Sequence, residues 1–168
     1  DTYRFLSPEN CANAGRWKTS NMEPSREIMD TISDPKYQEV VIKTSAQFSK
    51  TEILVNTLLY FVHLDPSSIL FIQPTVAAAE AFSKERVAPA IRDCKAIQHL
   101  VNNGKAKSQT ILTKQFVGTN LAFAGANSPV GLASRPIRLL LMDEISRYGQ
   151  SAGGAEGEGS AIFLAKQR

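Results

Sequence analysis

The sequence predicts a single α/β domain with a mainly parallel sheet flanked by helices. Short, continuously apolar runs of strand length alternate with stretches of helical periodicity, and two polar motifs each follow an apolar run. Strands buried on both faces read as continuous apolar runs, and parallel strands require right-handed crossovers of the kind that helices provide. With 168 residues, 43% of them apolar, the chain is long enough to bury a sizeable core.

The N-terminal part of the chain predicts a segment of turns and then a helix, a strand and a second helix. Residues 1–24 are polar and rich in turn-forming residues, so we expect an extended N-terminal segment there. A helix should follow, capped by Ser25 and ended by Pro35. Val40–Ile42 then predicts a buried strand, and the periodic apolar residues of Lys50–His63 predict a helix.

The rest of the chain continues this alternation, with turn-forming residues between the elements. The expected elements, in chain order, are a strand at Ile69–Ile72, a long helix from Thr75 to about Asp93 that Thr75 caps and that is interrupted or bent near Pro89, paired strands at Thr110–Phe116 and Asn120–Ala124, a loop at Gly125–Arg135, a strand at Leu139–Met142 and a flexible loop at Gly149–Ser160.

Composition bounds the functional class. Lys and Arg total 19 against 16 Asp and Glu, and this net charge of +3 permits contact with a polyanion without establishing it. Two cysteines, without further thiols at ligand spacing, indicate neither a disulfide framework nor a zinc site and favour a reducing cytoplasm. No stretch approaches the roughly 18 apolar residues of a membrane span, so we expect no membrane partner. The sequence opens without Met and stops within a helical pattern, which predicts a piece of a longer protein.

The first motif is Thr44–Thr51, between the strand expected at 40–42 and the helix expected from residue 50. A phosphate-binding loop needs backbone N–H groups at a helix N-terminus, a lysine for the outer phosphates and a hydroxyl for Mg²⁺. Lys50 and Thr51 meet the last two needs, but the standard pattern has glycine where Thr44 and Ser49 stand. Taken alone, the motif also fits an ordinary helix start. The expected nucleotide-binding residues are Ser45, Ala46, Gln47, Phe48, Ser49, Lys50 and Thr51.

The second motif is Asp143-Glu144, which directly follows the apolar run Leu139–Met142. In a P-loop enzyme the Asp at this position holds the Mg²⁺ shell, and the neighbouring Glu polarises the water that attacks the γ-phosphate. Taken alone, the pair also fits a plain strand exit. Both motifs, however, follow predicted parallel strands, at the sheet edge where open α/β sheets bind ligands. Together they predict a nucleoside triphosphate site on a P-loop NTPase fold.

On these residues the chain resembles the large terminase subunit of tailed phages, of the lambda-type group. The similarity covers nearly the whole chain, and the block from Ala124 to Tyr148 is specific to that group. The stretches that carry it are Tyr3–Glu9 with Gly15–Trp17, Arg26–Asp30, Ser45–Gln47 with Lys50–Glu52, Gln73–Thr75 with Glu80–Lys84, and Ala124–Pro129 with Gly131–Glu144.

The resemblance implies an ATPase that, assembled on the portal of an empty capsid, drives viral double-stranded DNA inward. It implies ATP and Mg²⁺ as cofactors, with Lys50 as the phosphate-loop lysine, Thr51 and Asp143 as Mg²⁺ ligands and Glu144 as the catalytic carboxylate. It also implies the small terminase subunit and the portal as partners of the full-length protein, a possible homo-oligomer in the assembled motor, and the host cytoplasm as location.

The resemblance further implies a position for the adenine, beside the region of Trp17 and Arg26. Residues 1–24 would then lie near the adenine, and residues 25–168 would form the ATPase core. Arg135 and Arg138 are the cationic candidates for stabilising the transferred phosphate, with loop or strand-flank charge as the alternative interpretation. Large terminases continue into a coupling segment and a nuclease domain, so a chain of this extent is expected to hydrolyse ATP slowly or not at all, and not to cut DNA.

Ser49 is a departure from the family pattern, which has glycine before the loop lysine. Its Cβ would crowd the β-phosphate or require a backbone angle that serine tolerates poorly, so weakened nucleotide affinity is expected. This favours one alternative, a degenerate prophage module that keeps the fold and an assembly surface without binding nucleotide. The other alternative is a helicase-like ATPase acting on nucleic acid, but Asp143-Glu144 continues with Ile145-Ser146, which is not the helicase pattern.

Overall fold

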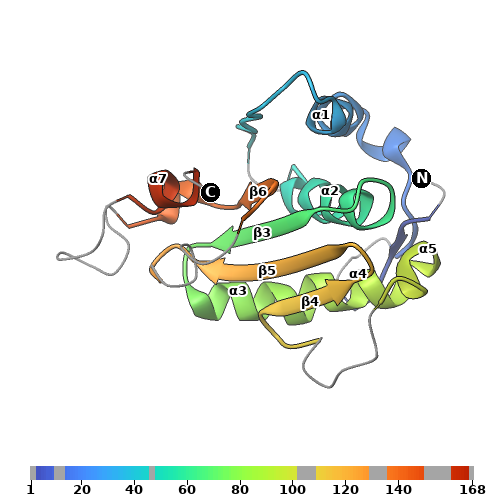
Figure 1. Ribbon diagram of the computed structural model, residues 1–168. Coiled ribbons are helices and arrows are strands. Elements are labelled where there is room, and N and C mark those ends of the chain that lie inside the picture. The colour runs from blue at the N-terminus through green and yellow to red at the C-terminus, as the bar shows by residue number, and fades with distance from the viewer. Residues whose placement is uncertain are drawn as a thin grey trace.

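The structure, a computed structural model, describes residues 3–9, 14–45, 48–101, 109–128, 136–149 and 160–166. Its centre is a four-stranded sheet in the order β4-β5-β3-β6 (Figure 1). The strands are β3 (Ser68–Gln73), β4 (Thr113–Phe116), β5 (Thr119–Gly125) and β6 (Leu139–Met142). Because β3 pairs in parallel with both β5 and β6, and β4 pairs antiparallel with β5, the expected mainly parallel α/β sheet is confirmed.

Helices cover both faces of this sheet. The helices are α1 (Pro24–Ser33), α2 (Lys50–His63), α3 (Val76–Phe82), α4 (Ala88–Asp93), α5 (Lys95–Gln98) and α7 (Ala161–Lys166). Side chains alternate along β3, so Ile69 and Phe71 pack against α2, α3 and α4, whereas Leu70 and Ile72 pack against α7 on the other face. Among the described residues, no helix combines the length and the apolar composition needed to cross a bilayer.

Several elements lie where the sequence predicts them. The helix expected at Lys50–His63 and the strand expected at Leu139–Met142 have those same bounds. The Thr75 hydroxyl caps α3 by accepting a hydrogen bond from the backbone N–H of Ala78, at 3.1 Å. The helix is interrupted near Pro89, as expected, by a π-helical turn, η2 (Ser83–Val87), between α3 and α4. Proline lacks the N–H that would donate to the carbonyl four residues earlier, which favours such a local change of helix type.

The prediction of a strand at Val40–Ile42 is wrong. These residues form no ladder with any strand of the described chain, and the Val41 side chain is 77% exposed. Residues 40–42 pair neither with β3, whose two edges are taken by β5 and β6, nor with the outer edge of β4 or β6. An apolar run becomes a strand only where a partner strand supplies the backbone hydrogen bonds.

Two further expectations near the N-terminus need correction. Ser25 does not cap α1: the helix begins at Pro24 with Glu23 as its N-cap, and the Ser25 hydroxyl donates to the carbonyl of Met22, at 2.6 Å. The N-terminal segment also contains more regular secondary structure than expected. It contains two short strands that pair antiparallel, β1 (Phe5–Leu6) and β2 (Gly15–Arg16), and a 3-10 helix, η1 (Thr19–Met22).

The predicted loops are tested only at their ends. The turn between β4 and β5 runs through Val117 and Gly118, as expected, and Gly118 has a positive φ of 78°. β5 extends one residue further than expected at each end, over Thr119–Gly125, whereas β4 begins at Thr113, three residues later than expected. Most of the loops expected at 125–135 and 149–160 lies outside the described residues.

Candidate functional site

The carboxyl ends of the parallel strands place polar residues of β3 and β6 side by side. Asp143 directly follows β6, and its backbone N–H donates to the carbonyl of Ile72 in β3, at 3.1 Å. By the alternation along each strand, Asp143 and Gln73 lie on the sheet face of Leu141 and Phe71, which packs against α2. Figure 1 shows that α2 runs in the direction opposite to β3 and β5, so its first turn is the part of the helix nearer to the carboxyl ends of those strands. Asp143 therefore lies on the sheet face that α2 covers.

Lys50 is the first residue of α2, and its side chain reaches Ser45, five residues earlier in the chain. The Lys50 ammonium, Nζ, donates to the backbone carbonyl of Ser45, at 3.1 Å. Ser49 is the N-cap residue, but its side chain makes no capping hydrogen bond. Thr51 lies in the same first turn and is half-buried, as is Phe48 before it. The helix start thus offers a lysine, a hydroxyl and uncapped N–H groups together, which suits an anion. Ala46 and Gln47 lie outside the described residues.

Ser49 has the backbone conformation that the sequence pattern predicted to be unfavourable for serine. Its φ is 58° and its ψ is 27°, in the left-handed region that favours glycine. Glu144, in the second motif, has a φ of 52°, and these two are the positive-φ residues other than glycine in the described chain. Non-glycine residues held in this region cost of order 1–3 kcal/mol each and cluster at functional sites.

Replacing Ser49 by glycine should therefore stabilise the chain by roughly 0.5–1 kcal/mol, because relief of a left-handed residue exceeds the entropy cost of a glycine. Urea denaturation of the parent and the variant measures the change. Ser20→Gly, in the 3-10 helix η1 at an ordinary φ, is the matched control and should be destabilising by a similar amount. Equal destabilisation by both changes would contradict the strain argument.

The carboxylate of Asp143 is held at both oxygens. The Gln73 side-chain amide donates from Nε2 to Oδ2 at 3.2 Å, and the backbone N–H of Glu144 donates to Oδ1 at 3.0 Å. The Tyr148 hydroxyl donates, at 2.9 Å, to the carbonyl of Ile72, which also accepts the backbone N–H of Asp143. Burial and the neighbouring Asp143 carboxylate raise the pKa of Tyr148, so this hydroxyl keeps its proton at neutral pH.

The second carboxylate, Glu144, lies further out. Its side chain is 46% exposed and forms an ion pair of 3.0 Å with Arg147, at the end of the 3-10 helix η3 (Ile145–Arg147) that Glu144 caps. Exposed pairs of this kind hold a side chain only weakly. Glu144 is thus accessible to solvent beside the more restrained Asp143.

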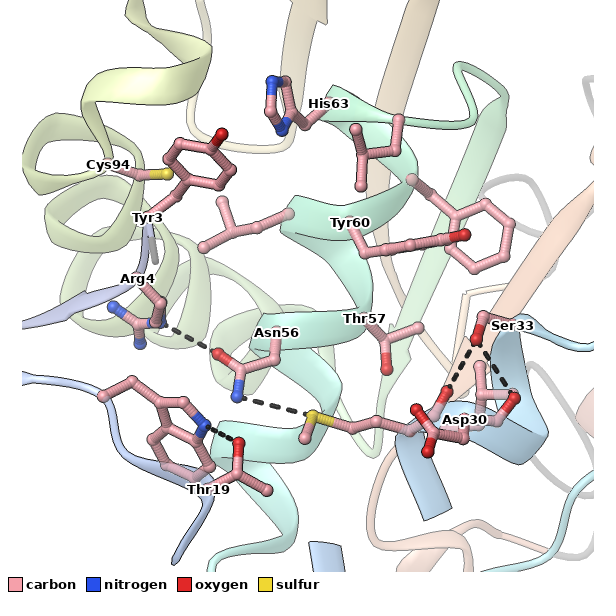
Figure 2. Close-up of a pocket in the computed structure, with 16 residues that line it drawn as sticks. Tyr3, Arg4, Thr19, Asp30, Ser33, Asn56, Thr57, Tyr60, His63 and Cys94 are labelled. Atoms are coloured by element: carbon pink, nitrogen blue, oxygen red, sulfur yellow. Dashed lines mark hydrogen bonds between the residues drawn. The ribbon is translucent and has the colours of Figure 1, made fainter. Parts of the chain in front are cut away.

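The N-terminal segment is fixed to the same helix. Arg4 donates from Nη2 to the Glu52 carboxylate at 2.7 Å. It also donates from Nε to the Asn56 side chain, one turn further along α2, at 3.1 Å (Figure 2). Arg4 and Glu52 have side chains only 11% and 15% exposed. The Glu52 carboxylate also lies 3.9 Å from Arg86 in the π-helical turn η2. Residues 3–9 therefore brace the first two turns of α2.

The two residues expected beside the adenine, Trp17 and Arg26, are not brought together. Trp17 is buried, donates from Nε1 to the Thr19 hydroxyl at 3.1 Å, and lines a cavity of about 300 Å³ between α1, α2 and the N-terminal segment. Arg26 lies on the exposed face of α1, pairs with Glu23 at 2.8 Å, and lines a different, shallow cleft. The helical periodicity of α1 turns Arg26 away from the cavity.

Of the two arginines considered for the transferred phosphate, Arg135 lies outside the described residues. Arg138 is at the wrong end of β6: its backbone N–H donates to the carbonyl of Ser68, the first residue of β3. Its guanidinium donates to both carboxylate oxygens of Asp65, each at 2.7 Å, and this pairing raises the pKa of Arg138. A strand of four residues separates it from Asp143, so Arg138 is a structural ion-pair partner.

Sequence reasoning missed Gln73 and Tyr148 as residues of this site. The only local signal is that Gln73, a polar residue, ends a strand whose other residues are largely buried and apolar. Tyr148 carries no local signal, because its partner is a backbone carbonyl far away in the sequence.

Comparisons with known proteins bear on what this arrangement does. A family described as the phage terminase large subunit gpA, ATPase domain, matches residues 11–168. The chain is also similar to a protein of Enterobacteria phage P21 named "Terminase, large subunit", with 29% identity over 168 residues, which amount to 98% of this chain and 25% of that protein. The chain thus spans about a quarter of the length of this relative. No solved structure gives a significant match.

Proposed function

The chain belongs to the family of phage terminase large subunit gpA ATPase domains, and we propose that it has a P-loop NTPase fold that binds and hydrolyses ATP with Mg²⁺. The observation that supports this proposal is that Asp143 directly follows β6 on the sheet face covered by α2, the helix that begins at Lys50. We infer from this that the two motifs of the P-loop type lie at the same edge of the sheet, where α/β folds bind ligands.

The donor groups at this edge fit the two cofactors. The backbone N–H groups at the uncapped start of α2 suit binding of the phosphates, and the positive charge of Lys50 would balance the negative charge of those phosphates. Thr51 and Asp143 supply hard oxygen ligands, and the described residues hold no cluster of three or more acidic, His or Cys ligands. Mg²⁺ commonly takes one or two protein oxygens and completes its shell with water and substrate phosphate, so this sparse set suits it.

Within this site each residue has a distinct task. Lys50 exchanges its hydrogen bond with the Ser45 carbonyl for the outer phosphates, and Glu144 orients and polarises the attacking water. Bound Mg²⁺ would neutralise charge that develops on the phosphates. Asp143 and Thr51 would hold that ion, and the brace between Arg4 and Glu52 keeps the helix that carries Lys50 and Thr51 in place.

At the level of the whole protein, we propose a DNA-packaging motor that couples ATP hydrolysis to the movement of viral double-stranded DNA into a capsid. Family membership and the similarity to a terminase large subunit support this. The proposal includes the small terminase subunit and the capsid portal as partners, homo-oligomer formation in the motor, and the host cytoplasm as location. Residues 1–24 would form a brace near the nucleotide and residues 25–168 the ATPase core.

Replacing Lys50 by alanine should weaken binding of a fluorescent ATP analogue by roughly tenfold to hundredfold, the worth of one charge-assisted contact. Fluorescence titration of the chain in the presence of Mg²⁺ measures the dissociation constant. Lys95→Ala, at the first residue of α5, is the matched control and should leave it unchanged. A parent chain that binds no analogue would overturn the nucleotide-binding proposal. A Lys50→Ala variant that binds the analogue normally would show that Lys50 does not contribute to nucleotide binding.

The second candidate function, a degenerate module without nucleotide binding, is favoured by one observation, the left-handed conformation of Ser49. The same titration separates the two. Under the motor proposal, the parent binds the analogue and Ser49→Gly binds it at least as tightly. A parent that fails to bind, with binding restored in Ser49→Gly, would establish the degenerate module instead.

A further inference from the structure

We infer that Gln73 is a positioning residue for Asp143, so that the last side chain of the central strand fixes the carboxylate proposed to hold Mg²⁺. The inference rests on the proposed function. It starts from one contact: the Gln73 amide Nε2 donates to Asp143 Oδ2 at 3.2 Å, between residues 70 positions apart in the sequence.

The fold places Gln73 where it has little freedom to move. It ends β3, which has β5 on one side and β6 on the other, and it is 6% exposed. Its own carbonyl accepts the backbone N–H of Ala126, at 2.8 Å, so its main chain is fixed as well. The parallel register that pairs Ile72 with Met142 brings the next residues of the two strands, Gln73 and Asp143, side by side.

The chemistry of the side chain suits this task. A carboxylate rotates about its terminal torsion unless both oxygens are held, and that torsion has only a shallow preference of its own. With Oδ2 held by the Gln73 amide and Oδ1 by the backbone N–H of Glu144, the plane of the Asp143 carboxylate is set. Each oxygen has two lone-pair sites and therefore keeps acceptor capacity for a cation or its water. An amide does this without adding a charge that would compete with, or repel, a cation.

Further hydrogen bonds beside Asp143 indicate that the contact with Gln73 belongs to a larger hydrogen-bonded group. The Ile72 carbonyl accepts both the Asp143 backbone N–H at 3.1 Å and the Tyr148 hydroxyl at 2.9 Å. The first of these bonds fixes the Asp143 backbone, while Gln73 fixes its side chain. Hydrogen-bond partners of metal ligands commonly change metal affinity or activity by about 10- to 100-fold when they are removed.

Gln73→Met tests this, because methionine keeps the length of the side chain and removes the donor. The measurement is the Mg²⁺ concentration that half-saturates binding of the ATP analogue, together with the analogue's dissociation constant in EDTA. We expect the Mg²⁺ requirement to rise roughly 10- to 100-fold and the metal-free dissociation constant to stay within about twofold. An unchanged Mg²⁺ requirement, or equal weakening with and without Mg²⁺, would overturn the inference.

Two controls separate positioning from a general structural effect. Gln98→Met removes a side-chain amide that donates to the Arg92 carbonyl away from the site, and it should leave both constants unchanged. In an Asp143→Asn background, Gln73→Met should add little to the Mg²⁺ requirement, because the group that it positions is already altered. Full additivity of the two changes would contradict the inference. If Gln73→Met does not fold, Gln73→Asn withdraws the amide by one methylene and carries the same expectation.

A readout without nucleotide distinguishes failure of this inference from failure of the proposed function. The side-chain amide resonances of Gln73, observed by ¹⁵N NMR in the nucleotide-free chain, should shift in Asp143→Ala and stay in place in Lys50→Ala. Resonances that do not respond to Asp143→Ala would overturn the positioning role even where nucleotide binding is normal. A parent that binds no nucleotide, with the expected shift intact, would overturn the proposed function alone.

Discussion

Replacing Glu144 by glutamine is expected to slow ATP hydrolysis by about 10²- to 10⁴-fold, the usual contribution of a positioned acid-base group. Glutamine has the shape of glutamate but cannot accept a proton from the attacking water. Glu144 is 46% exposed and lies outside both core clusters, so the fold should be unaffected. Single-turnover hydrolysis of radiolabelled ATP, with protein in excess, measures the rate, and affinity for the analogue should stay within roughly twofold, because the lost interaction is made in the transition state.

Arg147→Met is the matched control for Glu144→Gln. It removes the 3.0 Å ion pair with Glu144 but leaves the carboxylate itself. Because exposed ion pairs contribute only about 0–1 kcal/mol, hydrolysis should change by no more than a few-fold. A rate in Glu144→Gln equal to that of the parent would remove Glu144 from the catalytic role. Equal losses in the two variants would assign the effect to the ion pair.

The elements predicted best from the sequence are those in which local pattern and tertiary packing agree. In the helix Lys50–His63 and the strand Leu139–Met142, the apolar residues that form the sequence pattern are residues that the fold buries fully or partly. Val40–Ile42 has an apolar run of similar kind but forms no strand, because no strand edge pairs with it. A sequence pattern specifies that a segment is apolar, and the fold decides whether a partner edge is present.

The residues of the candidate site likewise include some that the sequence predicts and some that only the fold reveals. Lys50 and Asp143-Glu144 are recognisable from motifs of adjacent residues, and the strain at Ser49 follows from the glycine that the motif normally has there. Gln73 becomes recognisable only through the register between β3 and β6, which joins residues 70 positions apart. Contacts that depend on strand register are not contained in any local window of the sequence.

The site is held in place by the apolar centre of the sheet, where Phe71 lies two residues before Gln73. Phe71 is fully buried. Its ring stacks on Phe82 of α3 at a centroid distance of 4.4 Å and lies 5.9 Å from the ring of Phe123 in β5. One side chain thus joins the central strand to a neighbouring strand and to the helical layer. Loss of this ring would leave a cavity between rigid elements that have little room to collapse.

Phe71→Ala should therefore lower the free energy of unfolding by about 3–5 kcal/mol, the range for deleting a buried aromatic ring. Urea denaturation followed by circular dichroism measures the loss, and Phe71→Leu, which keeps most of the volume, should lose clearly less. Phe163→Ala is the matched control in α7: its side chain is 64% exposed, and the change should stay within about 0.5 kcal/mol. A loss below about 1 kcal/mol in Phe71→Ala would mean that the ring does not pack as described, because such small values are typical of surface positions.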